Sequence, residues 1–317
     1  MPFDFSLVSA PFRMQPGLRR VASGALQLTP ALPNSRHLRE KMVVLASFPA
    51  QALQSVARYD VAPLFAALAA EASMDAPAAF AFDADAGLDA DAPLLGWSIH
   101  RGEPTGDGDP AIGALLSALP PSQRATALLC LAFEEDFAVL DGDTSAVPWL
   151  AVCLPSRWAP CEKLGRHFAA IHAPVADSAM LLAASASLAR LVTGADRWER
   201  FVWTISSDTR LNQHPAQGRT PWPADADADH DALAALASFR SERQTFVPMA
   251  GSHQAIFTIH IESVPLARAV NTGEAARRVH DALASMSPAV LDYRGLADAR
   301  DRLLSWLASR ASPRMGA

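Results

Sequence analysis

The chain has 317 residues, of which 50% are hydrophobic and 19% are charged, and this composition is typical of a globular protein with a sizeable buried core. Its formal net charge of -6 excludes a general binder of polyanions, because neutralising phosphates requires a basic face. We therefore expect no nucleic-acid partner.

The amino terminus, MPFDFSLVSAPFR, has no positive residue before its short apolar part, so it does not resemble a secretory signal. The apolar stretch 178–189 is too short to span a bilayer. We expect a cytoplasmic protein with no membrane partner. The cysteines have no metal-type spacing and leave one unpaired in any disulfide scheme, so we predict three core thiols, namely Cys130, Cys153 and Cys161.

The first third of the chain contains one helical pattern and one low-complexity tract. Bulky apolar residues recur at approximately helical spacing from Pro49 to Ala72, which predicts a helical pair with a break at Pro63. From Met74 to Ala111 the chain is rich in alanine and aspartate and includes AFDADAGLDADAP. Alternating small and acidic residues build little core, so we predict a surface loop there.

Strand-like segments occupy the middle of the chain. The run ATALLCLAF from Ala125 leads into EEDFAVLDGD, and VPWLAVCLP follows the turn 141–143, which predicts a hairpin. WERFVWTIS and QAIFTIHIESV alternate bulky and polar residues and predict further antiparallel strands, with a loop at 210–230 between them. From Leu266 onward, helical spacing predicts two terminal helices. Strands in one central run with helices on either side indicate an α+β fold.

Several familiar catalytic signatures are missing, namely GxSxG, HExxH, the P-loop and GxGxxG. Standard hydrolase and nucleotide chemistries therefore lose support. The turn 141–145 lacks the glycine and glutamate of a calcium loop, so we interpret it as a plain turn. An acidic run allows either a divalent-ion site or a solvated loop, and it consists of Asp225, Asp227, Asp229 and His230.

The densest group of candidate functional residues is CLPSRWAPCEKLGRHFAAIHAPV, at 153–175. A helix is predicted to begin near Pro160 and to end before Pro174, with His172 in its last turn. An imidazole at a helix end can point into an adjoining pocket, as an axial metal ligand must. His167 lies about 140° away around the helix, so the two histidines cannot share one pocket. The alternative is a structural histidine with satisfied hydrogen bonds.

Read with three other segments, this stretch resembles the haem-dependent oxidative N-demethylase alpha-subunit family. The other segments are APFRMQPGLRR at 10–20, FEEDF at 133–137, and RSERQT at 240–245 with its continuation to 266. The most specific match is a pattern carried by Pro155, Ser156, Trp158, Pro160, Lys163, Gly165 and the segment from Ile171 to Val175.

The resemblance implies a PAS-like antiparallel sheet with flanking helices, elaborated by terminal helices, in a single domain over 1–310 with a disordered tail at 311–317. It also implies a b-type haem that activates O2 to oxidise the N-methyl group of a small amine and to release formaldehyde. The electrons would come from a separate flavin and iron-sulfur reductase that uses NADPH. Such a division of labour agrees with the missing nucleotide motifs.

Mapped onto this chain, the resemblance makes His172 the ligand of the haem iron. It also makes Trp158 a cofactor contact, while Lys163 and Arg243 would offset the propionates. For Arg243 the alternative is a surface ion pair across the sheet with Glu242.

Three carboxylates are candidates for the substrate site. Glu135 and Asp136 could hold an ammonium group, or they form a solvated strand end. Glu262 stands where the family usually has a tyrosine, and further departures occur at Val202, Val247 and Pro248. Two other functions stay open, a haem enzyme that oxidises another nitrogenous metabolite and a non-catalytic PAS-type haem sensor.

Overall fold

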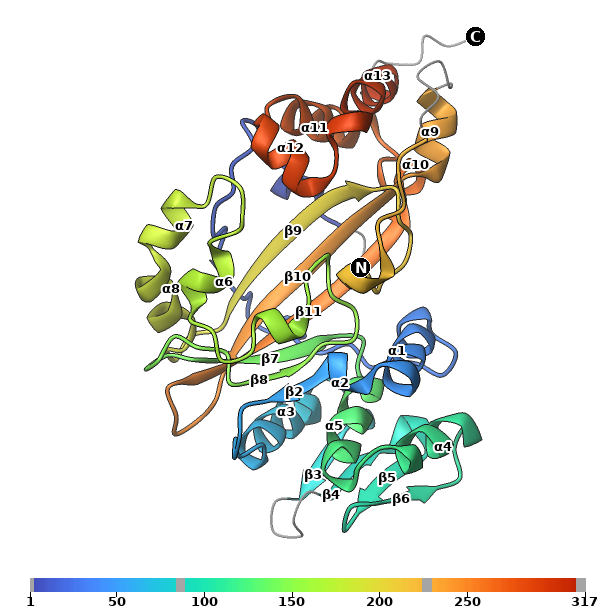
Figure 1. The fold of residues 1–317 in the computed structure, drawn as a ribbon, viewed down its shortest axis with the longest axis vertical. Helices are drawn as coiled ribbons and strands as arrows, with labels where there is room; N and C mark the ends of the chain where they lie inside the picture. The colour runs from blue at the N-terminus through green and yellow to red at the C-terminus, as the bar shows by residue number, and fades with distance from the viewer. Residues whose placement is uncertain (1–2, 84–88, 224–229, 312–317) are drawn as a thin grey trace.

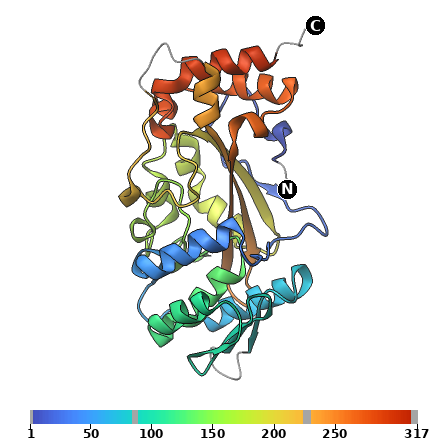
Figure 2. The same ribbon diagram turned by 90° about the vertical axis from the view of Figure 1, so that its right-hand side faces the viewer.

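The computed structural model describes residues 3–83, 89–223 and 230–311, and these residues form the predicted α+β fold. A long antiparallel sheet occupies the middle of the molecule (Figure 1). The C-terminal helices lie at one end of its long strands, and a smaller sheet with its own helices lies at the other end. Figure 2 shows the same three tiers from the side.

The large sheet has seven strands, and every neighbouring pair in it is antiparallel. Their order is β1 (Arg19–Arg20), β9 (Trp198–Ser206), β10 (Ser238–Pro248), β11 (Gln254–Pro265), β7 (Asp136–Asp141), β8 (Trp149–Ala151) and β2 (Leu53–Ser55). Strands β9 and β11 coincide with the two predicted alternating segments. The predicted hairpin is confirmed by β7 and β8, and the carboxylate of Asp141 closes its turn by accepting hydrogen bonds from the backbone and hydroxyl of Thr144.

The segment from Ala125 is not a strand, contrary to the prediction. It belongs to helix α5 (Pro121–Ala132), which has a proline in its first turn, where the missing N–H costs nothing. All residues from Ala125 to Ala132 are buried. Because no polar face interrupts this run, its periodicity does not distinguish a buried helix from a buried strand.

The alanine- and aspartate-rich tract is also more ordered than predicted. Its described part forms a four-stranded antiparallel sheet, made of β3 (Ala81–Asp83), β4 (Asp89–Ala92), β5 (Trp97–His100) and β6 (Glu103–Gly106). Ala90 and Ala92 are fully buried, and β4 packs against α5. Small side chains let a helix approach a sheet closely, so this tract contributes core rather than loop.

The remaining N-terminal helices connect the two sheets. They are α1 (Arg36–Ser47), α2 (Pro49–Ala52), α3 (Ala62–Asp75) and α4 (Pro110–Ala118). The predicted helical pair is corrected, because its first member is a single turn followed by strand β2. The side chain of Ser35 caps α1 by accepting a hydrogen bond from the backbone of Leu38.

The predicted terminal helices are present but are divided at glycine and proline residues. They are α10 (Leu266–Ala269), α11 (Gly273–Ala284), α12 (Pro288–Arg294) and α13 (Arg300–Ala311). Together with α9 (His230–Leu236), they bury a core around Trp306 against one end of the large sheet. Of the tail predicted at 311–317, Ala311 is the last residue of α13, and the rest lies outside the described residues. Of the acidic run, His230 begins α9, and its three aspartates lie outside the described residues. The linking segment 210–223 is irregular apart from one turn of 3₁₀ helix.

Three short helices cover the middle of the large sheet (Figure 1), namely α6 (Phe168–His172), α7 (Ala179–Ala183) and α8 (Ser185–Val192). Apolar residues of α6 and α8 pack against side chains of β7, β8, β10 and β11. Cys130 and Cys153 are buried as predicted, whereas Cys161 is exposed because it lies in a surface 3₁₀ turn. The described helices include none with the length and apolar character that a membrane span requires.

Candidate functional site

Two adjoining cavities lie between the large sheet and the segment that leads through α6. Their volumes are about 210 and 340 Å³. Together they reach the size range of ordinary ligand pockets, roughly 300–1,000 Å³. They share the lining residues Ser156, Arg157, Trp158, Val175, Glu242, Gln244 and Tyr293.

His172 is the last residue of α6 and lines the smaller cavity. Its Nδ1 lies 2.8 Å from the carbonyl oxygen of Phe168, and because a carbonyl only accepts, Nδ1 carries the hydrogen. The lone pair of a neutral ring is therefore on Nε2. Burial lowers the pKa of His172 to about 4, so the imidazole is neutral at pH 7.

The helix predicted from Pro160 to Pro174 is wrong, because the structure has a 3₁₀ turn at Pro160–Glu162 and α6 begins only at Phe168. His167 therefore precedes the helix that carries His172, and it has a different task. It is the N-cap of α6, and its Nδ1 accepts a hydrogen bond of 3.1 Å from the backbone N–H of Ala169. This bond satisfies one of the unpaired donors at the helix start. His167 therefore helps to begin the helix whose last turn carries His172.

Two further predicted residues, Trp158 and Lys163, line the smaller cavity beside His172. The ammonium group of Lys163 donates to the carbonyl oxygen of Ile171 at 3.3 Å, and burial lowers the pKa of this lysine. The same cavity has apolar walls from the sheet and the covering segment, formed by Ala138, Leu140, Val147, Leu150, Ile171, Phe246, Phe257 and Ile259.

Arg243 is not part of this group. Side chains alternate between the faces of a strand, so Arg243 lies on the face opposite that of Glu242 and Gln244, which line the cavities. Its guanidinium donates to the Glu199 carboxylate at 2.9 Å and to the Leu26 carbonyl at 2.6 Å. Arg243 thus forms a cross-strand ion pair, with Glu199 rather than Glu242 as its partner.

The three carboxylates expected at the substrate site do not line either cavity. Asp136 accepts a hydrogen bond of 2.6 Å from the backbone of Leu154, and Glu135 accepts one of 2.9 Å from the backbone of Thr29. Both are buried, so they are not a solvated strand end either. Glu262 is paired in register with Ser241, two residues beyond His260 on β11.

Sequence reasoning missed a cluster of arginines around the larger cavity, consisting of Arg157, Arg219, Arg240 and Arg294. Arg240 donates to the Ser156 hydroxyl and to two carbonyls, so its hydrogen bonds involve no carboxylate. Burial lowers the pKa of Arg240 and that of Arg294 to about 10. These residues come from four separate segments, and no local spacing in the sequence relates them.

The larger cavity is consequently rich in positive charge. Its lining contains four arginines, and Glu242 is the one carboxylate among its described lining residues. The Nε atom of Arg294 is buried and has no hydrogen-bond partner among the described residues. A buried donor without a partner carries an energetic cost, and an anionic ligand group would remove it.

Among the departures from the family pattern, Val202 lines the larger cavity. Neither cavity is lined by Val247 or Pro248, which end strand β10. A comparison with known protein families identifies one matching family. The family model described as haem-dependent oxidative N-demethylase, alpha subunit-like, matches residues 107–304, a range that includes His172 and the strands that form the cavities.

Proposed function

Since the chain belongs to the haem-dependent oxidative N-demethylase, alpha subunit-like family, we propose that it is the haem-carrying subunit of an enzyme that oxidises an N-methylated amine. One observation carries this proposal: a neutral imidazole, that of His172, opens onto an apolar cavity that adjoins an arginine cluster. In the same proposal, the large sheet with α6, α7 and α8 is the PAS-like part of the fold.

The residues present fit a b-type haem. A porphyrin is a flat and mostly apolar ring with two carboxylates on one edge, and the two cavities offer apolar walls on one side and arginines on the other. The haem would supply the activation of O2, while the protein tunes it through the axial ligand and the polarity of the pocket. His172 would hold the iron through Nε2.

The second ring nitrogen of His172 supports this role. A metal-bound histidine generally donates its other N–H to a carbonyl or carboxylate, which fixes the tautomer and the ring orientation. The Nδ1 bond to Phe168 does this within a single helical turn. The Phe168 ring lies 4.2 Å from the imidazole, centroid to centroid, and restricts its rotation further.

Arg157 and Arg294 are the cations that we propose for the propionates, in place of Arg243. Arg157 lines both cavities, and burial together with the neighbouring Arg219 lowers its pKa, as expected where positive charges face one another. Propionate carboxylates would relieve this repulsion through charge-assisted hydrogen bonds. Lys163 would neutralise charge nearer to the ring.

Glu242 is the carboxylate that we propose for recognition of the amine. It lines both cavities, is mostly buried, and accepts a hydrogen bond of 2.6 Å from the side chain of Gln244. A protonated secondary or tertiary amine would pair with its other oxygen. Pairing in a dehydrated cavity is stronger than at the surface, where an ion pair contributes roughly 0–1 kcal/mol.

The electrons for this reaction would come from a separate flavin and iron-sulfur reductase that oxidises NADPH. This proposal rests on the family, whose name denotes one subunit of an enzyme, and on the missing nucleotide motifs. The purified chain should then oxidise no NADPH by itself.

The proposal is tested by an absorption spectrum of the purified chain before and after dithionite, followed by turnover assays. We expect a Soret band that shifts on reduction, and formaldehyde from dimethylamine or trimethylamine in air once a reductase is added. If the chain binds haem but forms formaldehyde from neither amine, the proposed haem site is retained. The function would then be that of a non-catalytic haem sensor or of a haem enzyme that oxidises another nitrogenous metabolite. A purified chain that takes up no haem would overturn the proposal.

A further inference from the structure

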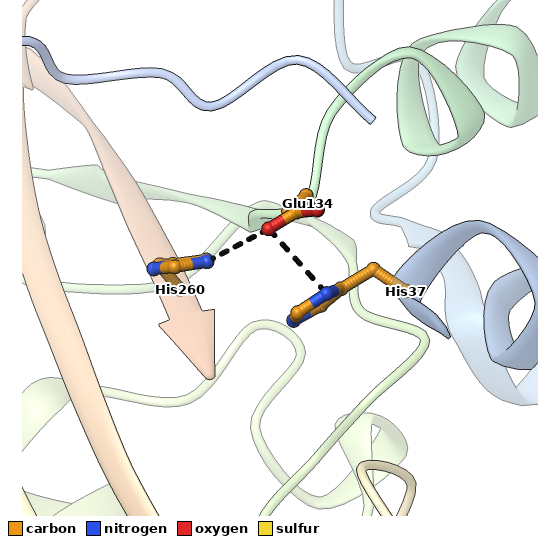
Figure 3. Close-up of side chains that lie close together, drawn as sticks. All are labelled: His37, Glu134 and His260. Carbon is orange, nitrogen blue, oxygen red and sulfur yellow. Dashed lines mark hydrogen bonds and ion pairs between the residues drawn. The ribbon is translucent and has the colours of Figure 1, made fainter. Parts of the chain in front are cut away.

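A second cluster of metal-ligating side chains lies away from the cavities, formed by His37, Glu134 and His260. Figure 3 shows that they converge from three elements: His37 from α1, His260 from β11, and Glu134 from the segment that precedes β7. The carboxylate Oε2 of Glu134 lies 3.2 Å from His260 Nε2 and 3.4 Å from His37 Nδ1. All three ligand atoms lie within 4.8 Å of one another.

The two ring nitrogens of His37 both face hydrogen-bond acceptors, namely the carbonyl oxygen of Ile261 and the carboxylate of Glu134. Its Nε2 lies 2.7 Å from the carbonyl oxygen of Ile261, which can only accept, so Nε2 carries the hydrogen. In the neutral ring, Nδ1 then has a lone pair that faces the carboxylate of Glu134. Two acceptors at 3.4 Å repel each other unless a positive species lies between them, either a proton on His37 or a metal ion.

We propose that His37, Glu134 and His260 bind a divalent first-row transition-metal ion such as Zn²⁺ or Fe²⁺. Two imidazoles and a carboxylate suit these metals better than Mg²⁺ or Ca²⁺, which prefer oxygen ligands. Ligands at about 2.1 Å from a tetrahedral ion lie about 3.4 Å apart, which agrees with the two distances to the carboxylate. The ligand atoms of the two histidines, which lie within 4.8 Å of one another, would have to approach to about the same 3.4 Å when the ion binds.

The surroundings hold this site in place. Lys41 lies one helical turn after His37 on α1, and its ammonium group donates to the carbonyls of Phe133 and Glu135, the two neighbours of Glu134. The rings of His37 and His260 are stacked, with centroids 5.4 Å apart and planes inclined by 26°. Such fixed supporting contacts keep ligand side chains oriented and are a general requirement of metal sites.

The site is distinct from the proposed haem site. Ile259 lines the smaller cavity, and the next residue on β11, His260, points to the opposite face of the strand. The three side chains are between 8% and 17% exposed, so solvent has limited access. Three protein ligands leave a coordination position for water or a small ligand, as in catalytic rather than structural zinc sites.

The experiment uses the purified chain of 317 residues with its haem, first treated with a chelator and then titrated with Zn²⁺ against a chromogenic chelator. Co²⁺ is the second probe, because its visible absorption reports the coordination number. We expect one Zn²⁺ per chain, with affinity reduced about 100-fold or more in Glu134→Gln and in His260→Gln. His253→Gln is the matched control, since His253 pairs with Asp143 on the exposed surface.

The Soret band and the far-ultraviolet circular dichroism verify that each variant is folded and still holds its haem. Co²⁺ should give the visible bands of a four- or five-coordinate site in the wild type, and these bands should be missing in His260→Gln. Either of two results would overturn the proposal. The wild type could bind Zn²⁺ no more tightly than the two variants, in which case a proton bridges Glu134 and His37, or His253→Gln could lose as much affinity as the variants.

Discussion

The ammonium nitrogen of Lys41 lies 3.3 Å from Oδ1 of Asp136, and the two side chains are 0% and 1% exposed. Burial disfavours the charged form of the lysine, but the Asp136 carboxylate, together with the weaker contributions of Cys153, Cys130 and Glu135, outweighs burial and raises the pKa of Lys41. Because Lys41 also binds the carbonyls of Phe133 and Glu135, it fastens α1 to the start of β7. Asp136, in the acidic segment at 134–136, thus helps to hold α1 against the large sheet.

Lys41→Met should lower the free energy of unfolding by about 3–5 kcal/mol, because it leaves a buried carboxylate without its partner. The measurement is urea denaturation followed by circular dichroism. Arg278→Met is the control, since Arg278 pairs with Glu274 on an exposed helix face and such a pair contributes roughly 0.3–0.5 kcal/mol. If both variants lose the same free energy of unfolding, the buried pair contributes no more to stability than the exposed pair does.

His172→Ala should remove the Soret band of the reconstituted protein or shift it strongly, because the proposed axial ligand is lost. His167→Ala should keep the wild-type spectrum, since His167 only caps the helix, and should cost at most about 2 kcal/mol of stability. Absorption spectra at matched protein concentration give the comparison. Loss of haem from the His167 variant alone would transfer the ligand role to that residue.

Glu242→Gln should weaken the binding of dimethylamine to the ferric protein by about tenfold, because a neutral amide keeps the shape but loses a charge-assisted hydrogen bond. Titration of the Soret shift with the amine gives the dissociation constant. Glu262→Gln serves as the matched control and should leave the constant unchanged, since Glu262 lines neither cavity. A larger effect at Glu262 than at Glu242 would refute this assignment.

The stability of the haem-free chain should depend on pH through His172. Its pKa is about 4 in the folded state, against 6.5 for an unperturbed histidine. As the pH falls below 6.5, the unfolded chain binds a proton that the folded chain does not, so stability decreases until the pH reaches about 4. Between pH 7.5 and 5, the urea midpoint should fall further for the wild type than for His172→Gln. If the urea midpoints of the two proteins fall equally between these pH values, the pKa of His172 is not lowered in the folded state.

The sequence predicted those elements whose periodicity is visible in one short window. Strands β9 and β11 alternate bulky and polar residues, and they were placed correctly. For helix α5 the sequence predicts a strand instead, because every residue from Ala125 to Ala132 is buried and no exposed stripe marks the helical period. For strand β4 the sequence predicts a loop, because alanine and aspartate have low strand propensity and the strand is favoured by tertiary packing against α5.

The residues of the candidate sites also differ in whether a short stretch of sequence reveals them. His172 was recognisable because a helix end and a specific local motif surround it, and the structure places it on a cavity beside Trp158 and Lys163. The arginine cluster and the cluster of His37, Glu134 and His260 were not recognisable. Glu134 and His260 are 126 residues apart, so only the register of the folded sheet brings them together.

The successive residues Ile259 and His260 commit β11 to a single alignment with its neighbours. A slip by one residue would turn His260 toward the cavity and Ile259 toward Glu134, so it would abolish both candidate sites at once. Insertions and deletions should therefore be tolerated in the loop between β10 and β11 but not within β11 itself. Both sites therefore depend on the same register of β11. During evolution the side chains of either site can be substituted independently, but neither site can move along the strand without the other.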